Sequence, residues 1–152
     1  MPVLIGLFFI ALLLAPSQQS NLSSGQGTLV IEERSTDIPV RTPDPQVRYR
    51  LTNGGFISRT TDGGTTWNGQ LVSANAELAA GSAPSRNVCW VVGAKGTIYR
   101  TIDGITWKKV HAPSQADLTA VSAKDASSAT LTAAGGKKFS TTNNGRSWQP
   151  VQ

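Results

Sequence analysis

The hydrophobic positions of the chain fall into one long apolar run followed by many short ones. The long run extends without a break from Val3 to Ala15. As an α-helix it would span about 20 Å, whereas the core of a bilayer is about 30 Å thick. That length is typical of a signal peptide, but no Lys or Arg precedes the run, so the end of a longer membrane anchor is the alternative. In either case we expect residues 3–15 to place the following domain outside the cytoplasm, as an exported, periplasmic or membrane-anchored protein.

Residues 1–17 are therefore predicted to form the signal peptide or anchor, and residues 18–46 a polar linker with room for a first strand. Beyond them the apolar runs are short and are separated by Gly, Asn and Asp. This pattern is typical of an all-β protein with many tight turns. No segment outside the leader has a convincing helical pattern.

The chain from residue 47 onward contains an internal repeat. Three tryptophans recur at intervals of about 40 residues, and each ends a similar phrase: TTDGGTTW at 60–67, TIDGITW at 101–107 and TTNNGRSW at 141–148. The sequences upstream of the phrases also align. We therefore predict three repeats, at about 47–73, 77–112 and 117–152.

Each repeat is predicted to contain four short strands, which in the middle repeat fall near 77–83, 87–93, 96–102 and 106–111. The segment from Val88 to Val92 is apolar at every position, as expected for a strand that is covered on both faces.

The phrases have the chemistry of a hairpin connection. An Asp carboxylate can accept hydrogen bonds from backbone N–H groups nearby, Gly supplies a positive φ, and the hydroxyl residues can bond to the backbone. Trp then covers the hairpin with a large apolar area. We assign a structural role to these positions: Thr60, Asp62, Gly64, Trp67, Thr101, Asp103, Gly104, Trp107, Thr141, Asn143, Gly145 and Trp148.

These phrases resemble Asp boxes, the bacterial neuraminidase repeats of sialidase-like propellers and of photosystem II assembly/stability factors. The segment from Cys89 to Gly104 is especially similar to the photosystem II factor type. The resemblance covers roughly residues 47–152. It implies propeller-type blades, and it implies little about function because Asp boxes occur in many unrelated proteins. Below, the three phrases are called the first, second and third box.

The repeats depart from the family pattern in four ways. The second box is one residue shorter than the others, and the third has Asn143 in place of Asp. The last repeat has Thr130 where the middle one has Trp90, and it is more polar, as expected for a terminal repeat. Three blades are also too few for a ring that usually needs four to eight. We therefore expect an open arc or partial β-propeller of three four-stranded blades, after an N-terminal apolar helix.

The composition shows that the chain is basic and that it has little capacity for disulfide bonds or thiol chemistry. The net charge is +5, which favours acidic partners. Because Cys89 is the one cysteine, no intramolecular disulfide can form. Its apolar surroundings favour an inert, buried thiol.

The sequence offers no convincing catalytic or metal site. A sialidase would need a tyrosine nucleophile beside an acid, and nothing places Glu77 near Tyr49 or Tyr99. His111 is the single histidine, so a histidine-based metal cluster is excluded. We expect no enzyme activity, no cofactor, no metal and no nucleic-acid binding.

The arginines are the candidate partner-binding residues. Arg59 and Arg100 precede two boxes at equivalent positions, and Arg48 and Arg50 add charge to the first repeat. The resemblance implies a basic surface that holds a partner protein. The alternative is that Arg at this position is part of the repeat consensus and covers a neighbouring Trp by a cation–π contact.

Together these features predict a protein-interaction or assembly module. Its partner would be another protein or a second copy, bound through the uncovered blade flanks of the arc, which we expect to be apolar. Two other classes remain: the extracytoplasmic sensor part of a membrane-anchored regulator, and a sialidase-like carbohydrate-binding or glycosidase remnant.

Overall fold

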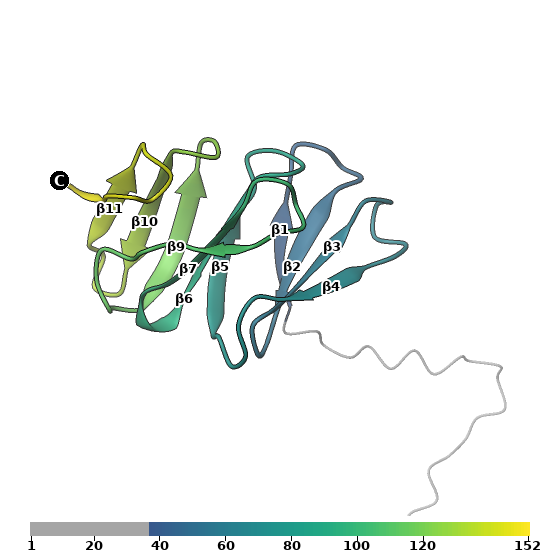
Figure 1. Ribbon diagram of the computed structural model, residues 1–152, viewed down its shortest axis with the longest axis horizontal. Helices are drawn as coiled ribbons and strands as arrows, with labels where there is room; N and C mark the ends of the chain where they lie inside the picture. The colour runs from purple at the N-terminus through teal and green to yellow at the C-terminus, as the bar shows by residue number, and fades with distance from the viewer. Residues whose placement is uncertain (1–36) are drawn as a thin grey trace, which may run out of the picture. The chain divides into compact units, whose positions relative to one another are not determined.

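The computed structural model describes residues 37–152, which form three four-stranded antiparallel sheets in chain order (Figure 1). The first contains β1 (Ile38–Arg41), β2 (Arg48–Thr52), β3 (Phe56–Thr60) and β4 (Asn68–Leu71). The second contains β5 (Leu78–Ser82), β6 (Cys89–Gly93), β7 (Thr97–Thr101) and β8 (Lys108–Lys109). The third contains β9 (Leu118–Ala123), β10 (Ala129–Ala133), β11 (Lys138–Thr141) and β12 (Gln149–Val151). We call these sheets blades 1, 2 and 3.

The predicted fold class is confirmed. Within every blade each strand pairs with the next strand of the sequence, and the four strands of blade 2 lie within their expected ranges. The one helical element of residues 37–152 is a short 3₁₀ turn, η1 (Ala94–Gly96). No helix in this part of the chain is long and apolar enough to cross a membrane. The apolar leader at residues 3–15, with the helix expected for it, lies outside the described residues.

Blade 1 starts earlier than the repeat boundary predicted at residue 47. The first strand, for which the 18–46 region had room, is β1, and its Val40 pairs with Tyr49 of β2. The sequence of β1 resembles β5 and β9 too weakly for the repeat comparison to reach it.

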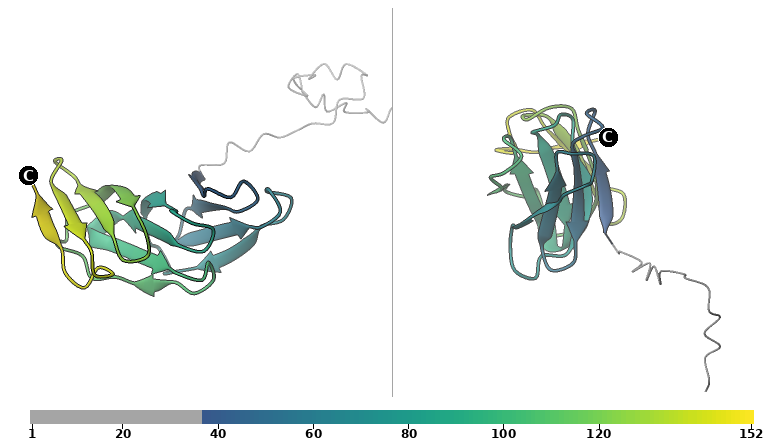
Figure 2. Two further views of the ribbon diagram at one scale, coloured as in Figure 1. Left: turned by 90° about the horizontal axis from the view of Figure 1, so that it is seen from above. Right: turned by 90° about the vertical axis from the view of Figure 1, so that its right-hand side faces the viewer.

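The hydrophobic core lies between the blades. The first seam joins blades 1 and 2, and its buried residues include Tyr49, Leu51 and Ile57 from one side and Val91 from the other. The second seam joins blades 2 and 3, and is filled in the same way by the residues Trp90, Val92, Ile98, Val110, Leu118, Leu131 and Phe139. The left view of Figure 2 shows the blades in succession.

Strand β6 belongs to both seams, which explains its unbroken apolar sequence. Because successive side chains of a strand point to opposite faces, Cys89 and Val91 face blade 1 whereas Trp90 and Val92 face blade 3. All five residues of β6 are buried. Blade 2 therefore supplies apolar surface to both of its neighbours, as the sequence predicts.

Trp107 and Trp67 hold the same box position but differ in what covers them, which allows a matched test. Trp107 packs in the first seam, edge-on to Tyr49 with ring centroids 6.1 Å apart, whereas Trp67 has no preceding blade beside it among the described residues. We predict that Trp107→Ala lowers the free energy of unfolding by about 3–5 kcal/mol, as truncation of a packed Trp does. Trp67→Ala should cost less than half as much. Urea denaturation followed by circular dichroism measures both, and equal losses would contradict this account of the seams.

Candidate functional site

A buried threonine hydroxyl organises each of the three boxes. Thr60, Thr101 and Thr141 are almost fully buried. The Thr101 hydroxyl donates to Asp103 Oδ1 at 2.9 Å and accepts from the Gly104 N–H at 2.9 Å. The other boxes repeat both contacts, with Thr60 and with Thr141. Each buried hydroxyl thus both donates and accepts a hydrogen bond within its own turn.

The Asp or Asn side chain of each box accepts hydrogen bonds from the backbone ahead of it. Asp62 accepts from the Thr66 N–H at 2.9 Å, and Asn143 accepts from the Ser147 N–H at 3.0 Å. In the shorter second box, Asp103 accepts from the N–H groups of both Ile105 and Thr106. An amide oxygen therefore replaces the carboxylate in the third box without loss of the turn geometry.

The same hydrogen bonds lower the pKa of two box carboxyls. The pKa of Asp62 falls well below its ordinary value mainly because the Thr66 hydroxyl and N–H donate to it. The pKa of Asp103 falls equally, chiefly through the N–H groups of Thr106 and Ile105. These donors stabilise the charged form, so both carboxylates are committed to their turns.

The box glycine allows one blade to approach the next. Gly104 has φ +75°, and a Cβ placed there would lie 2.8 Å from the Arg59 guanidinium of blade 1. Gly145 has φ +76°, and its Cβ would lie 2.2 Å from Val110 of blade 2. Both glycines are needed for their backbone angle and for the space they leave.

The box carboxylates should make folding stability depend on acid pH. Because their pKa values are lower in the folded state, their contribution is present at neutral pH and is lost as the pH falls below about 4. We predict that Asp62→Asn combined with Asp103→Asn reduces the loss of thermal stability between about pH 7 and pH 3. The third box, with its natural Asn143, indicates that the turns will still form. Glu77→Gln is the control, and a double variant as acid-sensitive as the parent would refute the prediction.

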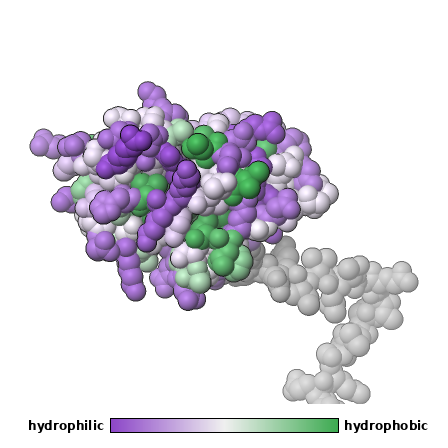
Figure 3. Space-filling model, in the orientation of Figure 1, coloured by the Kyte–Doolittle hydropathy of each residue, from purple (hydrophilic) through white to green (hydrophobic). Residues whose placement is uncertain are grey.

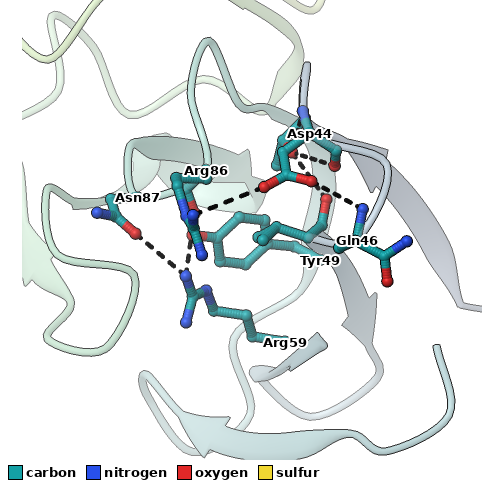
Figure 4. A network of polar contacts seen from close by, with 8 residues as sticks. Asp44, Gln46, Tyr49, Arg59, Arg86 and Asn87 are labelled. Carbon is teal, nitrogen blue, oxygen red and sulfur yellow. Dashed lines mark hydrogen bonds and ion pairs between the residues drawn. The ribbon is translucent and has the colours of Figure 1, made fainter. Parts of the chain in front are cut away.

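A second set of hydrogen bonds links blade 1 to a loop of blade 2, and blade 2 to a loop of blade 3. In the first seam, the Tyr49 hydroxyl and the Arg59 guanidinium both donate to the Arg86 carbonyl, at 2.9 and 3.2 Å (Figure 4). Arg59 also donates to Asn87 Oδ1 at 3.1 Å. Burial raises the pKa of Tyr49 to about 12, so its hydroxyl remains protonated and continues to donate.

The second seam repeats this arrangement one blade further along. The Trp90 indole N–H donates to the Asp125 carbonyl at 3.1 Å, and Arg100 donates to the Ala126 carbonyl at 2.6 Å. Arg100 also donates to Asn144 Oδ1 at 3.0 Å. An aromatic and an arginine on neighbouring strands thus form a recurring clamp across each seam.

Two of the four candidate arginines belong to these clamps. The Arg59 guanidinium lies 5.8 Å from the ring centroid of Tyr49, and the Arg100 guanidinium lies 5.2 Å from that of Trp90. Each arginine therefore covers the aromatic ring of its own clamp, which is the Trp of the alternative interpretation for Arg100 and a Tyr for Arg59. One terminal nitrogen of each guanidinium makes both of its bonds to the next blade. Arg59 and Arg100 thus belong to different seams, and the structure does not bring all four arginines together on one binding surface.

The other two candidates lie on the end flank of blade 1. Arg48 and Arg50 occupy the positions held in blade 2 by Cys89 and Val91, which are buried in the first seam. The Arg50 guanidinium lies 4.3 Å from the ring centroid of Trp67, and its Nε lies 3.5 Å from Asp37 Oδ2. Arg50 therefore covers the box tryptophan that a preceding blade would otherwise cover.

Arg48 makes a hydrogen bond that a residue of a preceding blade makes in a seam. Its Nε donates to the Pro45 carbonyl at 3.2 Å. The corresponding carbonyl of blade 2, that of Arg86, accepts from the preceding blade through Arg59. The flank of blade 1 is therefore closed by its own arginines, next to a hollow of about 260 Å³ that Arg41 also lines.

The end flank of blade 3 is polar for a different reason. Thr130 and Ser140 stand where blade 2 has the clamp residues Trp90 and Arg100, and Lys138 stands where it has Ile98. Exposed apolar side chains do remain at the two ends, including Phe56, Leu71 and Val151. The two flanks are nevertheless less apolar than expected, because polar and basic residues replace most of the seam residues there. The face shown in Figure 3 is likewise mostly hydrophilic, with small scattered apolar patches.

Placing seam-like residues on the flank of blade 1 should promote self-association through this flank. We predict that Arg48→Ala combined with Arg50→Val increases self-association, because it exposes Trp67 beside new apolar surface. Sedimentation equilibrium at several concentrations would show a higher average mass than for the parent chain. Lys95→Asn combined with Lys124→Asn removes the same charge from exposed positions outside both end flanks and serves as the control. An unchanged mass would show that the arginines do not close this flank.

The groups considered for catalysis are in structural positions. Tyr49 belongs to a clamp, Tyr99 packs in the first seam, and Cys89 is buried beside it. Burial raises the pKa of the Cys89 thiol well above its ordinary value, which disfavours the reactive thiolate. Among residues 37–152 no three His, Cys, Asp or Glu side chains come together in a group that could hold a metal ion.

Two features of the surface are not apparent from the sequence. The carbonyls of Arg86 and Ala126 hold the clamps, and backbone acceptors leave no mark on a sequence. Lys108 and Lys109 form edge strand β8 beside the third box, a placement that the spacing of the repeats alone does not indicate. A position-by-position comparison of the repeats would have shown that blade 1 has no lysine there.

Solved structures share this fold. YCF48 bound to D1 peptide matches 77% of this chain with a TM-score of 0.68 and 21% sequence identity. YCF48 from Cyanidioschyzon merolae matches 76% with a TM-score of 0.67 and 22% identity. In both comparisons the chain spans 39% of the solved protein. The blades are therefore arranged as in part of a β-propeller of the YCF48 kind.

The similarity to these proteins is one of structure. No protein-family model matches the chain, and no curated protein matches it. The structural likeness thus shows the fold, and agrees with the propeller type that the box resemblance implied.

Proposed function

We propose that this chain is a non-enzymatic protein-binding module that takes part in the assembly of a partner protein outside the cytoplasm. The observation that carries the proposal is the fold shared with YCF48, one structure of which contains a bound D1 peptide. The repeats also resemble those of photosystem II assembly/stability factors. Since the chain spans 39% of the YCF48 structures, the partner itself is not inferred from them.

The chemistry of the described residues supports binding over catalysis. The polar groups of the boxes are used within their turns, and the clamp arginines are used between blades. The full sequence carries a net charge of +5, and we therefore expect a basic surface. Such a surface attracts acidic partners over distances of up to about 10 Å at moderate salt.

Cross-linking in the native membrane fraction tests the proposal. The tagged full-length chain is incubated with that fraction, cross-linked and purified, and captured proteins are identified by mass spectrometry. We expect a specific protein in near-stoichiometric amounts, with capture that weakens as salt is raised because charges steer the encounter. Capture by the tag alone is the control for specificity.

Two outcomes would overturn the proposal. The first is the absence of any protein captured above this control. The second is turnover of a fluorogenic sialoside, or saturable binding on a glycan array, without a protein partner. Either result would favour the carbohydrate-binding or glycosidase alternative.

A further inference from the structure

A basic groove runs along the second seam, beside the clamp and outside the core. It has a volume of about 380 Å³ and lies between edge strand β8 and the third box. Its lining comprises Arg100, Lys108, Lys109, Val110, His111, Asn144, Gly145 and Arg146. Lys108, Lys109 and Arg146 are exposed.

The cations of this groove have no acidic partners. Within residues 37–152, the ion pairs join Arg50 to Asp37 and Arg86 to Asp44, away from the groove. The Nε of Arg100 is buried and makes no hydrogen bond. Like charges held together without a counter-charge raise the local potential.

An adjoining hollow of about 270 Å³ shares Arg100 and Lys108 with the groove and adds Ile102 and Asp103. The Asp103 carboxylate is committed to the turn of the second box, where it accepts from two backbone N–H groups. Ile102 is 56% exposed. A ligand that follows the groove would therefore meet several cations and then an apolar side chain.

The first seam shows what this site looks like without the charges. Sheet register places Asn68 of β4 opposite Arg59, in the same way as Lys108 of β8 lies opposite Arg100. The neighbouring Gly69 corresponds to Lys109, and Ile105 of the second box corresponds to Arg146 of the third. Two seams of the same architecture thus differ in charge, so the groove is not a consequence of the fold.

We propose that this groove binds an acidic, extended peptide segment of the partner protein. The proposal rests on the function inferred above and gives it a site and a class of ligand. Carboxylates of the segment pair with Lys108, Lys109 and Arg146, and an apolar side chain packs on Ile102. A nucleic acid is a poorer match, because its phosphates need a continuous basic track and the equivalent positions of the first seam are neutral.

Fluorescence anisotropy with the full-length chain tests the site. The probe is a fluorescein-labelled peptide of alternating Glu and Leu. Lys108→Asn combined with Arg146→Ile gives the second seam the residues of the first at two of the three corresponding positions, and should weaken binding about tenfold or more. Lys124→Asn combined with Lys138→Thr removes the same charge outside the groove and should weaken binding less than threefold. Circular dichroism confirms that both variants are folded.

The converse change makes the test independent of loss of function. Asn68→Lys combined with Ile105→Arg should raise the stoichiometry of peptide binding from one to two. Equal losses in the two charge-removal variants would overturn the site, as would inorganic polyphosphate that binds more tightly than the peptide and is equally sensitive to Lys108→Asn with Arg146→Ile.

The cross-linking experiment then separates the site from the function. If the variant with Lys108→Asn and Arg146→Ile captures the same partner as the parent chain, the groove is wrong and the function stands. If the parent chain captures no partner, the function fails whatever the peptide does. Loss of capture in this variant, with capture retained in the control variant, supports both.

Discussion

Each sheet of this protein can bury its apolar faces only against another sheet. Four short strands have little apolar area of their own, and the core accordingly lies between blades. The central strand β6 is buried throughout because it is the one second strand with a blade on either side among the described residues. The clamps join the same pairs of blades. In the first seam, Tyr49 and Arg59 donate hydrogen bonds to the loop of the following blade, and in the second seam Trp90 and Arg100 do so. Stability is therefore a property of neighbouring pairs, as in other repeat proteins.

The fold was predictable because the repeat imposes the same local chemistry three times. The phrase from Thr101 to Trp107 predicts a hairpin on its own, and its recurrence gives the number and length of the blades. The buried threonine was harder to anticipate, because hydroxyl residues are common in turns and the sequence does not show which hydroxyl is enclosed. Strand β1 was placed only loosely, since Val40 is matched by Ser82 and Ser122 in the other blades.

The candidate site was predictable in part. The sequence indicates that Arg59 and Arg100 are equivalent, and each guanidinium does lie near an aromatic ring, although for Arg59 that ring is Tyr49 and not a Trp. It could not indicate that Arg48 and Arg50 face an end flank, because that depends on which face of β2 meets blade 2. The basic groove depends on residues from two repeats, Lys108 and Arg146, that are far apart in the chain. Such pairings become apparent only when one blade is laid against the next.

The position of Cys89 gives the protein an internal reporter of blade separation. The thiol is fully buried in the first seam and faces blade 1. An alkylating reagent can reach it only after blades 1 and 2 move apart, and it reacts with the thiolate, whose formation burial suppresses. The rate of labelling would therefore measure how often this seam opens locally, and comparison with global unfolding would show whether the blades separate singly or all at once. No engineered label is needed, since the chain has a single cysteine.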